Sequence, residues 1–563
     1  MVKSAPCGQP GRESRCDVAK RWREGGRRTA TAVVAVLTAV TLAACSPGSG
    51  GGGGGGTEEP QSTEHFGYLV DTSLVTTNAG SEVGASSNTE ALSGRLYPAV
   101  FVPGPSGQMI PNTDLVSTQV LPGANRQVIY TIAEHARYSD GAPLTCTDFL
   151  LSYKAGVHEG IFGSHLPQTG EVLRLDCEPG QKRFTVVFDK EGGGRWRHLF
   201  GPGSTLPAHA IAAKVGLSLE ELHTALQNDD LSTLVEVAPV WRDGFNLVDF
   251  DPALQVTSGP FVIDRVGPDG EVVLRPNDQY YGDAPDLDTI VVWPRGTEAE
   301  RLLEADALRV ADIRSSSPDW VDRDDPENTL AVDSRVGDLT DTLMLGDAGV
   351  FATAEARRAF AGCVDQNAVA AASSRVSGVE VPPVALHSLP HNDPAARQLV
   401  DVTDPELPTD IGRAQALTGA TIRIGYLGPD DRKAAMVAAI AESCGQAGIT
   451  VEDASGESTG LADLSKVTTG QWGETVIREG TLDAVLMAVD PMAEFGAASS
   501  RAVDVNYLRE AEKRLWQEVP SIPLAAQPRW FVIDRTVGNV VVYTGLAGIG
   551  WNMDRWLSED NGA

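Results

Sequence analysis

The chain has 563 residues and a formal net charge of −31, from 76 acidic and 45 basic side chains. This charge repels phosphate backbones and anionic lipid headgroups, which argues against a nucleic-acid-binding protein. The length is too great for one simple core, so two or three domains are expected.

The first 44 residues have the pattern of a secretory signal peptide. Eight basic side chains precede an uncharged run from Thr29 to Ala44, which is slightly short for a membrane-spanning helix. Leu42-Ala43-Ala44-Cys45 resembles the lipobox of bacterial lipoproteins, which implies cleavage before Cys45 and palmitate-type lipidation there. An ordinary cleavage site with an incidental cysteine is the alternative. Two or more acyl chains on Cys45 would anchor the protein stably to the membrane.

A glycine-rich segment follows the cysteine. Positions 48 and 50–56 are glycine, so residues 45–64 are predicted to form a flexible tether with an r.m.s. reach of roughly 25 Å. We therefore expect an extracytoplasmic protein on the outer face of the cytoplasmic membrane. Because residues 1–44 carry eight basic and three acidic side chains, the chain after them carries −36.

Four cysteines remain once Cys7 and Cys16 leave with the signal and Cys45 is lipidated. An even number outside the cytoplasm favours disulfides. Three pairings are possible, and the local one joins Cys146 to Cys177 and Cys363 to Cys444. No two of the four are close in sequence and none has a histidine at ligand spacing, so no metal site is predicted.

Residues 126–156 begin the succession of strands and helices. Val128, Tyr130 and Ile132 alternate with their neighbours as in a half-buried strand. A turn at 139–141 follows, and Thr145 with Asp148 predicts a capping box that opens a helix. Residues 183–189 read as another alternating strand, which would bring Cys177 near Cys146.

The later segments predict a partly parallel sheet. Residues 257–294 read as two strands joined by a turn at 268–270, followed by a loop and a third strand. Residues 421–453 read as strand, helix and strand, and the apolar run 482–490 adds another strand, which indicates βαβ topology. Two Pro/Asp-rich stretches, at 388–410 and around 315–330, are candidate flexible joints.

Motifs of catalysis and of cofactor binding are not found in the sequence. It has no Gly-x-Ser-x-Gly elbow, no His-Glu-x-x-His and no glycine-rich phosphate loop between a strand and a helix. We therefore expect a protein that is not an enzyme and that needs no cofactor.

Several segments resemble, in order, those of one known family. VIYTIAEHARYSDGAPLTCTDFLLSY (128–153) looks like the signature region of the extracytoplasmic solute-binding proteins of the peptide/nickel/opine type. The ending GWNMDRW (550–556) is similar to that of actinobacterial lipoproteins of this type. Further matching segments are LPAHAI (206–211), SGPFVIDR (258–265), LRPNDQYYGDAPDLDTI (274–290), EARRAFAGCVDQNAVA (355–370), IRIGYLGPDDRKAAMVAAIAESCGQAGITVE (422–452) and LWQEVPSIPLAAQPRWFVID (515–534).

The resemblance implies an α/β fold of two lobes, the type II (cluster C) periplasmic-binding-protein-like fold, closing around a hinge. Lobe I would comprise residues 65–295 with an extra subdomain inserted at about 96–240. Lobe II would comprise 296–515, and residues 516–563 would return to lobe I. Both local disulfides would then lie within a lobe, which supports that pairing.

The resemblance also suggests ligand-binding residues, with one departure. Peptide-binding members carry Trp-x-x-Asp after the strand that matches 482–490, and the Asp takes the peptide amino terminus. Here Asp490 has no such Trp, and the loop 491–506 is short. Trp472 resembles an upstream pocket Trp, and Thr77 and Asn78 follow the first strand, where the cleft begins.

Two further aromatic residues, Tyr97 and Trp241, suit a wet, apolar pocket because their rings are amphipathic. Each of the six candidates also has a structural interpretation: a core ring for Tyr97, Trp241 and Trp472, a turn for Thr77 and Asn78, and a helix cap for Asp490.

The function that follows is a lipid-anchored substrate-binding component of an ABC importer. It would act as a monomer, capture an oligopeptide or similar small solute between its lobes, and deliver it to a membrane permease. The alternative is a non-transporting regulatory or scaffold lipoprotein of cell-envelope assembly that retains the fold, favoured by the missing Trp and the short loop.

Overall fold

The computed structural model describes residues 66–558 except 106, 124, 190–192, 315–316, 471 and 497–503. The predicted signal peptide, Cys45 and the glycine-rich tether lie outside the described residues. The described residues belong to one compact unit. No helix among them is both long and apolar enough to span a membrane.

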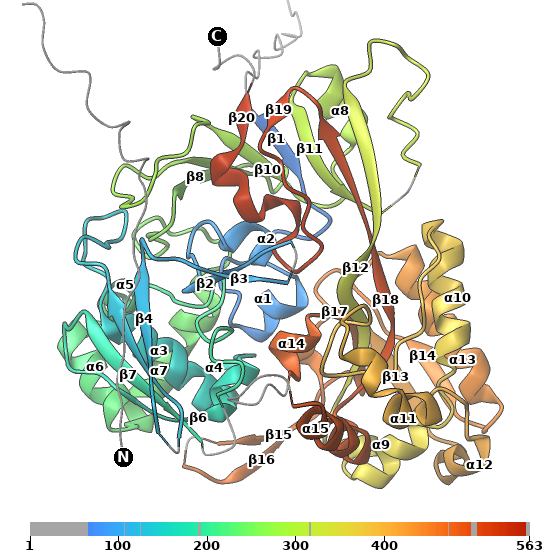
Figure 1. The fold of residues 1–563 in the computed structure, drawn as a ribbon. Coiled ribbons are helices and arrows are strands. Elements are labelled where there is room, and N and C mark those ends of the chain that lie inside the picture. The colour runs from blue at the N-terminus through green and yellow to red at the C-terminus, as the bar shows by residue number, and fades with distance from the viewer. Residues whose placement is uncertain are drawn as a thin grey trace, which may run out of the picture. The chain divides into compact units, whose positions relative to one another are not determined.

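A ten-stranded mixed sheet forms the framework (Figure 1). Its strands, in spatial order, are β14 (Thr450–Asp453), β13 (Thr421–Gly425), β17 (Ala484–Val489), β12 (Leu330–Leu345), β18 (Ser521–Asp534), β11 (Leu308–Ile313), β1 (Phe66–Leu69), β10 (Ile290–Trp293), β9 (Val272–Pro276) and β8 (Phe261–Val266).

Two large hydrophobic cores pack on different parts of this sheet. The first contains Tyr68, Trp241 and Trp556, and the second contains Ile424, Ile440 and Leu486. We call the part of the chain around the first core lobe I and the part around the second lobe II. Strand β11 pairs with β1 and so extends the lobe I side of the sheet past residue 295. The precise domain boundaries stay a prediction.

The lobes are joined by two long strands, β12 and β18, which run side by side from lobe I to lobe II (Figure 1). They pair from Leu330 with Asp534 to Val336 with Pro528, and again from Thr340 with Ala526. The ladder is interrupted between Val336 and Thr340, where the Cβ of an alanine at Gly337 would lie 3.0 Å from the Gln527 carbonyl oxygen. This close approach disfavours any larger residue at position 337.

Lobe I carries a separate antiparallel sheet of four strands: β4 (Val116–Leu121), β5 (Gln127–Ile132), β7 (Arg183–Phe188) and β6 (Val172–Asp176). The predicted capping box is confirmed, because the Thr145 N–H donates to Asp148 at 2.7 Å at the start of α3 (Cys146–Val157). Cys146 is disulfide-bonded to Cys177, as the local pairing predicted. The other helices of this region are α4 (Glu159–Phe162), α5 (Ala208–Lys214), α6 (Leu219–Gln227) and α7 (Leu231–Asp243).

Lobe II contains the predicted βαβ unit. Strand β13 runs parallel to both β14 and β17, and α13 (Asp431–Gly445) connects β13 to β14. The second predicted disulfide, Cys363–Cys444, ties α13 to the segment between α9 (Ala354–Ala361) and α10 (Gln366–Ser377). The candidate joint at 388–410 instead packs on lobe II through the buried Leu389 and Leu399.

The elements around the lobe interface are short. Lobe I contributes α1 (Glu82–Ser86), α2 (Glu90–Ser93), β2 (Phe101–Pro103), β3 (Met109–Pro111) and the 3-10 turn η1 (Pro167–Glu171). Lobe II contributes α14 (Pro491–Glu494) and a hairpin of β15 (Lys466–Thr469) and β16 (Thr475–Arg478). Remaining elements are α8 (Ala299–Glu304), α11 (Val400–Thr403), α12 (Ile411–Ala414), α15 (Val505–Glu518), β19 (Val537–Gly538), β20 (Leu557–Ser558) and the 3-10 segments Gly349–Phe351, Ala396–Gln398, Asp404–Glu406, Gln415–Leu417, Leu461–Asp463 and Gly548–Arg555.

Candidate ligand-binding site

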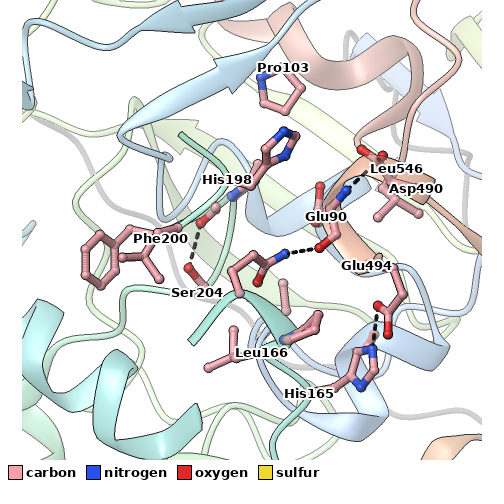
Figure 2. Close-up of a pocket in the computed structure, with 18 of the residues that line it drawn as sticks. Glu90, Pro103, His165, Leu166, His198, Phe200, Ser204, Asp490, Glu494 and Leu546 are labelled. Carbon is pink, nitrogen blue, oxygen red and sulfur yellow. Dashed lines mark hydrogen bonds and ion pairs between the residues drawn. The ribbon is translucent and has the colours of Figure 1, made fainter. Parts of the chain in front are cut away.

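A cavity lies between the lobes, where α2 and η1 of lobe I face the end of β17 and α14 of lobe II (Figure 2). Its inner part has a volume of about 120 Å³. A second, larger part of about 590 Å³ shares Pro103, His198, Asp490 and Tyr543 with it. We call the two parts together the cleft cavity, and polar side chains of both lobes line it.

Two carboxylates from different lobes point into the cleft cavity (Figure 2). Glu90 is the first residue of α2. Asp490 caps α14: its Oδ1 accepts hydrogen bonds from the Met492 N–H at 2.9 Å and the Ala493 N–H at 3.2 Å. Pro491 at the first helical position suits this start, because its missing N–H would have no helical partner. The cap fixes the Asp490 carboxylate in place.

Neither carboxylate is neutralised by a basic side chain. Among the described residues, Glu90 and Asp490 form no ion pair with lysine or arginine. Burial, with the charge of Asp490 as a second cause, raises the pKa of Glu90 to about 8. A carboxyl with such a shifted pKa in a cleft is a typical sign of a functional site. A ligand that brings positive charge would lower the pKa of Glu90 and stabilise the charged form of its carboxyl group.

The basic residues of the cleft are otherwise engaged. The Arg197 guanidinium lies 4.5 Å from the centre of the Trp196 ring, a cation–π contact. Burial lowers the pKa of His198 more than the charge of Asp490 raises it, so this imidazole is neutral at pH 7. His198 can thus donate or accept a hydrogen bond without adding charge.

Side chains of lobe I contact α14 of lobe II directly, so the cleft is closed. His165 Nε2 lies 2.8 Å from Glu494 Oε2. The Ala493 carbonyl accepts hydrogen bonds from Arg195 at 2.7 Å and from Gln168 at 2.8 Å. Burial would raise the pKa of Glu494, but the neighbouring charge of His165 holds it below its usual range. These contacts exist only while the lobes are together.

Four of the six ligand candidates lie inside lobe I and do not line the cleft cavity. Asn78 is buried and donates to the Trp241 carbonyl at 2.7 Å, while its own oxygen accepts from Gly80 at 3.0 Å. Thr77 is buried and donates to Gln255 at 3.2 Å. These bonds correspond to the turn interpretation of both residues.

The two buried rings pack against phenylalanines. Tyr97 meets Phe245 edge to face with centroids 6.2 Å apart, and Trp241 meets Phe162 at 5.6 Å. Trp472 is 78% exposed in the turn of the β15–β16 hairpin. Of the six candidates, Asp490 therefore lines the cleft cavity, and its role as a ligand contact stays a prediction.

Sequence reasoning missed Glu90, His198 and Glu494, which line the same cavity. An acidic residue in the first turn of a helix is common, so Glu90 carried no distinctive signal. All three residues line a cavity that segments far apart in the chain form together, which no local sequence pattern encodes.

The family model for bacterial extracellular solute-binding proteins, family 5 (middle region), matches residues 123–493, which is more than half of the chain. The chain belongs to this family. It is 28% identical over 590 aligned positions to the uncharacterized lipoprotein Rv2585c of Mycobacterium tuberculosis, covering 96% of this chain and 99% of the relative.

Solved structures of the family share the fold. The oligopeptide-binding protein AppA of Bacillus subtilis, in complex with a nonapeptide, matches with a TM-score of 0.60 and 13% identity, covering 88% of this chain and 99% of AppA. AgaA of Agrobacterium tumefaciens, in complex with agropinic acid, matches with a TM-score of 0.62 and 14% identity, covering 88% and 99%. The predicted two-lobed α/β fold is thereby confirmed.

Proposed function

We propose that this protein is the lipid-anchored substrate-binding component of an ABC importer, and that it captures an oligopeptide or similar small solute with a positively charged amine. One observation carries the proposal. Glu90 of lobe I and Asp490 of lobe II face one cavity between the lobes without a basic partner. A ligand cation between them would be bound by both lobes at once.

Such a ligand favours closure, because it contacts both carboxylates only when the lobes are together. A ligand shifts a conformational equilibrium by its difference in affinity for the two states. The solved structures named with a nonapeptide and with agropinic acid show that proteins of this fold hold solutes of different sizes. The closed form is the one that a membrane permease would receive.

The proposal is tested with the full chain, purified in detergent from a host that lipidates Cys45. Native mass spectrometry is expected to show a bound small molecule that is lost on denaturation. A pool of short peptides is expected to raise the Tm, and the same pool with acetylated amino termini is expected to raise it less. Equal shifts by the two pools would rule out recognition of the amine.

Asp490→Asn is the matched variant, because the amide can still cap α14 with its oxygen. We expect it to weaken peptide binding by about 10- to 100-fold, the value of a charged hydrogen bond. Glu300→Gln, on the exposed surface of α8, serves as the control and should bind like the wild type. An empty cleft with no Tm change in any peptide pool would favour the regulatory or scaffold lipoprotein instead.

A further inference from the structure

A second cavity, of about 80 Å³, lies between the lobes beside the strands that link them. Lobe I lines it with Asp71 and Arg295, lobe II with Asp430 and Lys433, and β18 with Arg529 and Trp530. We call it the hinge-side cavity. Ala85, Asn88, Met487 and Ala488 line both this cavity and the cleft cavity, and so form the wall between them.

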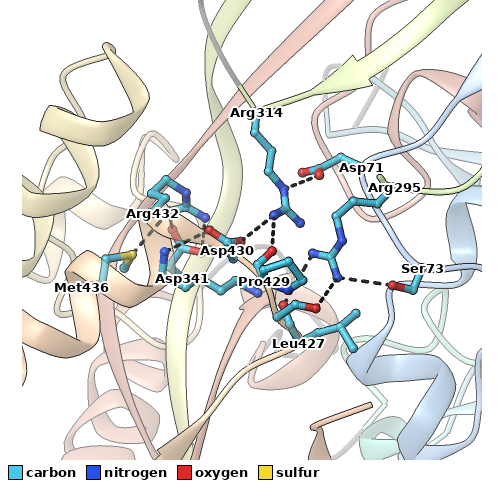
Figure 3. Close-up of polar contacts among 12 residues, drawn as sticks. Asp71, Ser73, Arg295, Arg314, Asp341, Leu427, Pro429, Asp430, Arg432 and Met436 are labelled. Atoms are coloured by element: carbon cyan, nitrogen blue, oxygen red, sulfur yellow. Dashed lines mark hydrogen bonds and ion pairs between the residues drawn. The ribbon is translucent and has the colours of Figure 1, made fainter. Parts of the chain in front are cut away.

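The carboxylates of the hinge-side cavity are already paired with arginines. Arg314 contacts Asp71 and also lies 3.5 Å from Asp430 (Figure 3). Asp312 is in contact with Arg529. Asp430 also caps α13, since its Oδ1 accepts from the Lys433 N–H at 3.0 Å. The negative charge of this cavity is therefore matched before any ligand arrives.

Positive charge remains, because five cationic side chains but only three carboxylates line the cavity. Arg432 is paired with Asp341, which does not line the cavity (Figure 3). Arg295 contacts only neutral acceptors at long distances: Ser73 at 3.3 Å, and the carbonyls of Leu427 at 3.5 Å and Gly428 at 3.4 Å. Hydrogen bonds of this length are weak.

Lys433 is the second cation without a carboxylate partner. Its side chain makes no hydrogen bond or ion pair within the described residues, although it lines the cavity. Burial lowers the pKa of Lys433 more than the charges of Asp430 and Asp341 raise it. A half-buried ammonium without a hydrogen-bond partner is costly, and an incoming anion would lower that cost.

A third hydrogen-bond donor in the hinge-side cavity is uncharged. The Trp530 side chain is 2% exposed, lines the same cavity, and its Nε1–H has no hydrogen-bond partner among the described residues. An indole N–H can only donate, as can lysine and arginine. The cavity thus offers unused donors from both lobes and from β18, and oxyanions are the ligands that accept from donors of this type.

We propose that the hinge-side cavity binds one oxyanion between Arg295 of lobe I and Lys433 of lobe II, and that the bound anion stabilises the closed arrangement. The space holds a few water molecules, and hence a small oxyanion such as phosphate, sulfate or a carboxylate group. Because the two cations belong to different lobes, opening separates them and lowers the affinity for the anion. The proposal does not depend on an amine-bearing ligand in the cleft.

The test is isothermal titration of the full chain in detergent, freed of small molecules by dialysis. The probes are sodium phosphate, sulfate and acetate at constant ionic strength set with chloride. We expect one molar equivalent of oxyanion to bind. Lys433→Gln and Arg295→Gln should each weaken this binding at least about tenfold, and Lys433→Arg should retain it. Lys513→Gln, an exposed lysine on α15, is the matched control and should leave it unchanged.

A second arm identifies the source of the anion. If no inorganic anion binds, but a peptide with a free carboxyl terminus raises the Tm more than its amide, and Lys433→Gln removes that difference, then the cleft ligand supplies the oxyanion. If an inorganic anion binds and the peptide carboxyl terminus has no effect, the oxyanion in the hinge-side cavity is a free anion. Equal affinity in the wild type and the two Gln variants overturns the proposal, as does the absence of both effects.

Discussion

Glu90 is held in the cavity with a pKa of about 8, against 4.5 for an ordinary glutamate. The folded protein therefore binds one more proton than the unfolded chain between these two values. By linkage, stability falls as the pH rises through that window. Glu90 is therefore mostly protonated at pH 7, and a cationic ligand would bind with release of this proton.

Glu90→Gln removes the group that titrates. We expect its free energy of unfolding to exceed that of the wild type increasingly from about pH 5 to pH 8, by up to about 1.4 kcal/mol per pH unit. Urea unfolding at pH 5, 6.5 and 8 measures this difference. Glu300→Gln should show no such trend. A difference between Glu90→Gln and the wild type that is constant with pH would mean that Glu90 titrates normally.

His387 and Glu512 form a fully buried pair in lobe II, with His387 Nδ1 2.7 Å from Glu512 Oε1. His387 Nε2 lies 3.0 Å from the Ser521 carbonyl oxygen. Both partners can only accept, so both ring nitrogens donate and the imidazole is charged. Burial would raise the pKa of Glu512, but His387 and Ser388 hold it below its usual range.

Glu512→Gln leaves a buried histidine without its counter-charge, so we expect a loss of about 3–5 kcal/mol of stability at pH 7. Because the Glu512 pKa is lowered, this stabilisation is present above the pKa of the unfolded chain and is lost as the pH falls through the folded value. Chemical unfolding at pH 7 and pH 4 measures both. Asp410→Asn, in an exposed pair with Arg413, should cost under about 1 kcal/mol.

Single residues of the site were predicted only in part from the sequence. Asp490 was identified because it ends an apolar strand that the family uses. Glu90 was not, because the cavity that it lines is completed by residues such as Asp490 from far along the chain. Asn78 and Trp241 were assigned to the ligand, yet they bond to each other inside lobe I. Side chains with the same chemistry suit a pocket and a core equally.

The β15–β16 hairpin is an element that holds the lobes together from outside the cavity. Glu82 of α1 accepts from Arg478 at 2.7 and 2.9 Å and from Lys466 at 3.2 Å. Burial would raise the pKa of Glu82, but the hydrogen bonds and charges of Arg478 and Lys466 hold it below its usual range. The Glu82 carboxylate is therefore charged and bound by lobe II at neutral pH.

Glu82→Gln should favour opening. Losing about 2 kcal/mol of attraction between the lobes shifts the ratio of closed to open molecules about thirtyfold. Small-angle X-ray scattering at low salt should show a larger radius of gyration than in the wild type. Glu479→Gln, exposed beside the same hairpin, should scatter like the wild type. Identical scattering from Glu82→Gln would show that the hairpin does not hold the lobes closed.

Structural elements that depend on residues close in sequence were predicted well. The capping box at Thr145, the turn at 268–270 and the βαβ unit at 421–453 depend on residues close in sequence. The segment 388–410 read as a joint because it is rich in proline and aspartate, yet Leu389 and Leu399 bury it against lobe II. The amino-acid composition of a segment does not show which other parts of the chain it packs against.

At the level of the whole molecule, each lobe has its own disulfide: Cys146–Cys177 lies in the first core and Cys363–Cys444 in the second. Their sequence separations are 31 and 81. Neither bond crosses between lobes, so both should stabilise the fold without restraining closure.

Replacing Cys363 and Cys444 by serine should cost roughly 4.5 kcal/mol, and replacing Cys146 and Cys177 roughly 3.7 kcal/mol, in the chain-entropy model. Guanidinium unfolding of both variants measures these losses. Peptide and oxyanion affinities at 20 °C below the respective Tm should equal those of the wild type. A change in either affinity would indicate that a disulfide also sets the geometry between the lobes.

The chain passes between the lobes only on β12 and β18 in its described part, and both are hydrogen-bonded strands. Movement about the interruption at Val336–Thr340 can rotate one lobe without ordering a loop. The conformational entropy lost on capture is then confined to the ligand and the side chains that touch it. Binding should therefore show a heat-capacity change set by the buried cleft surface alone, without the contribution of a folding segment.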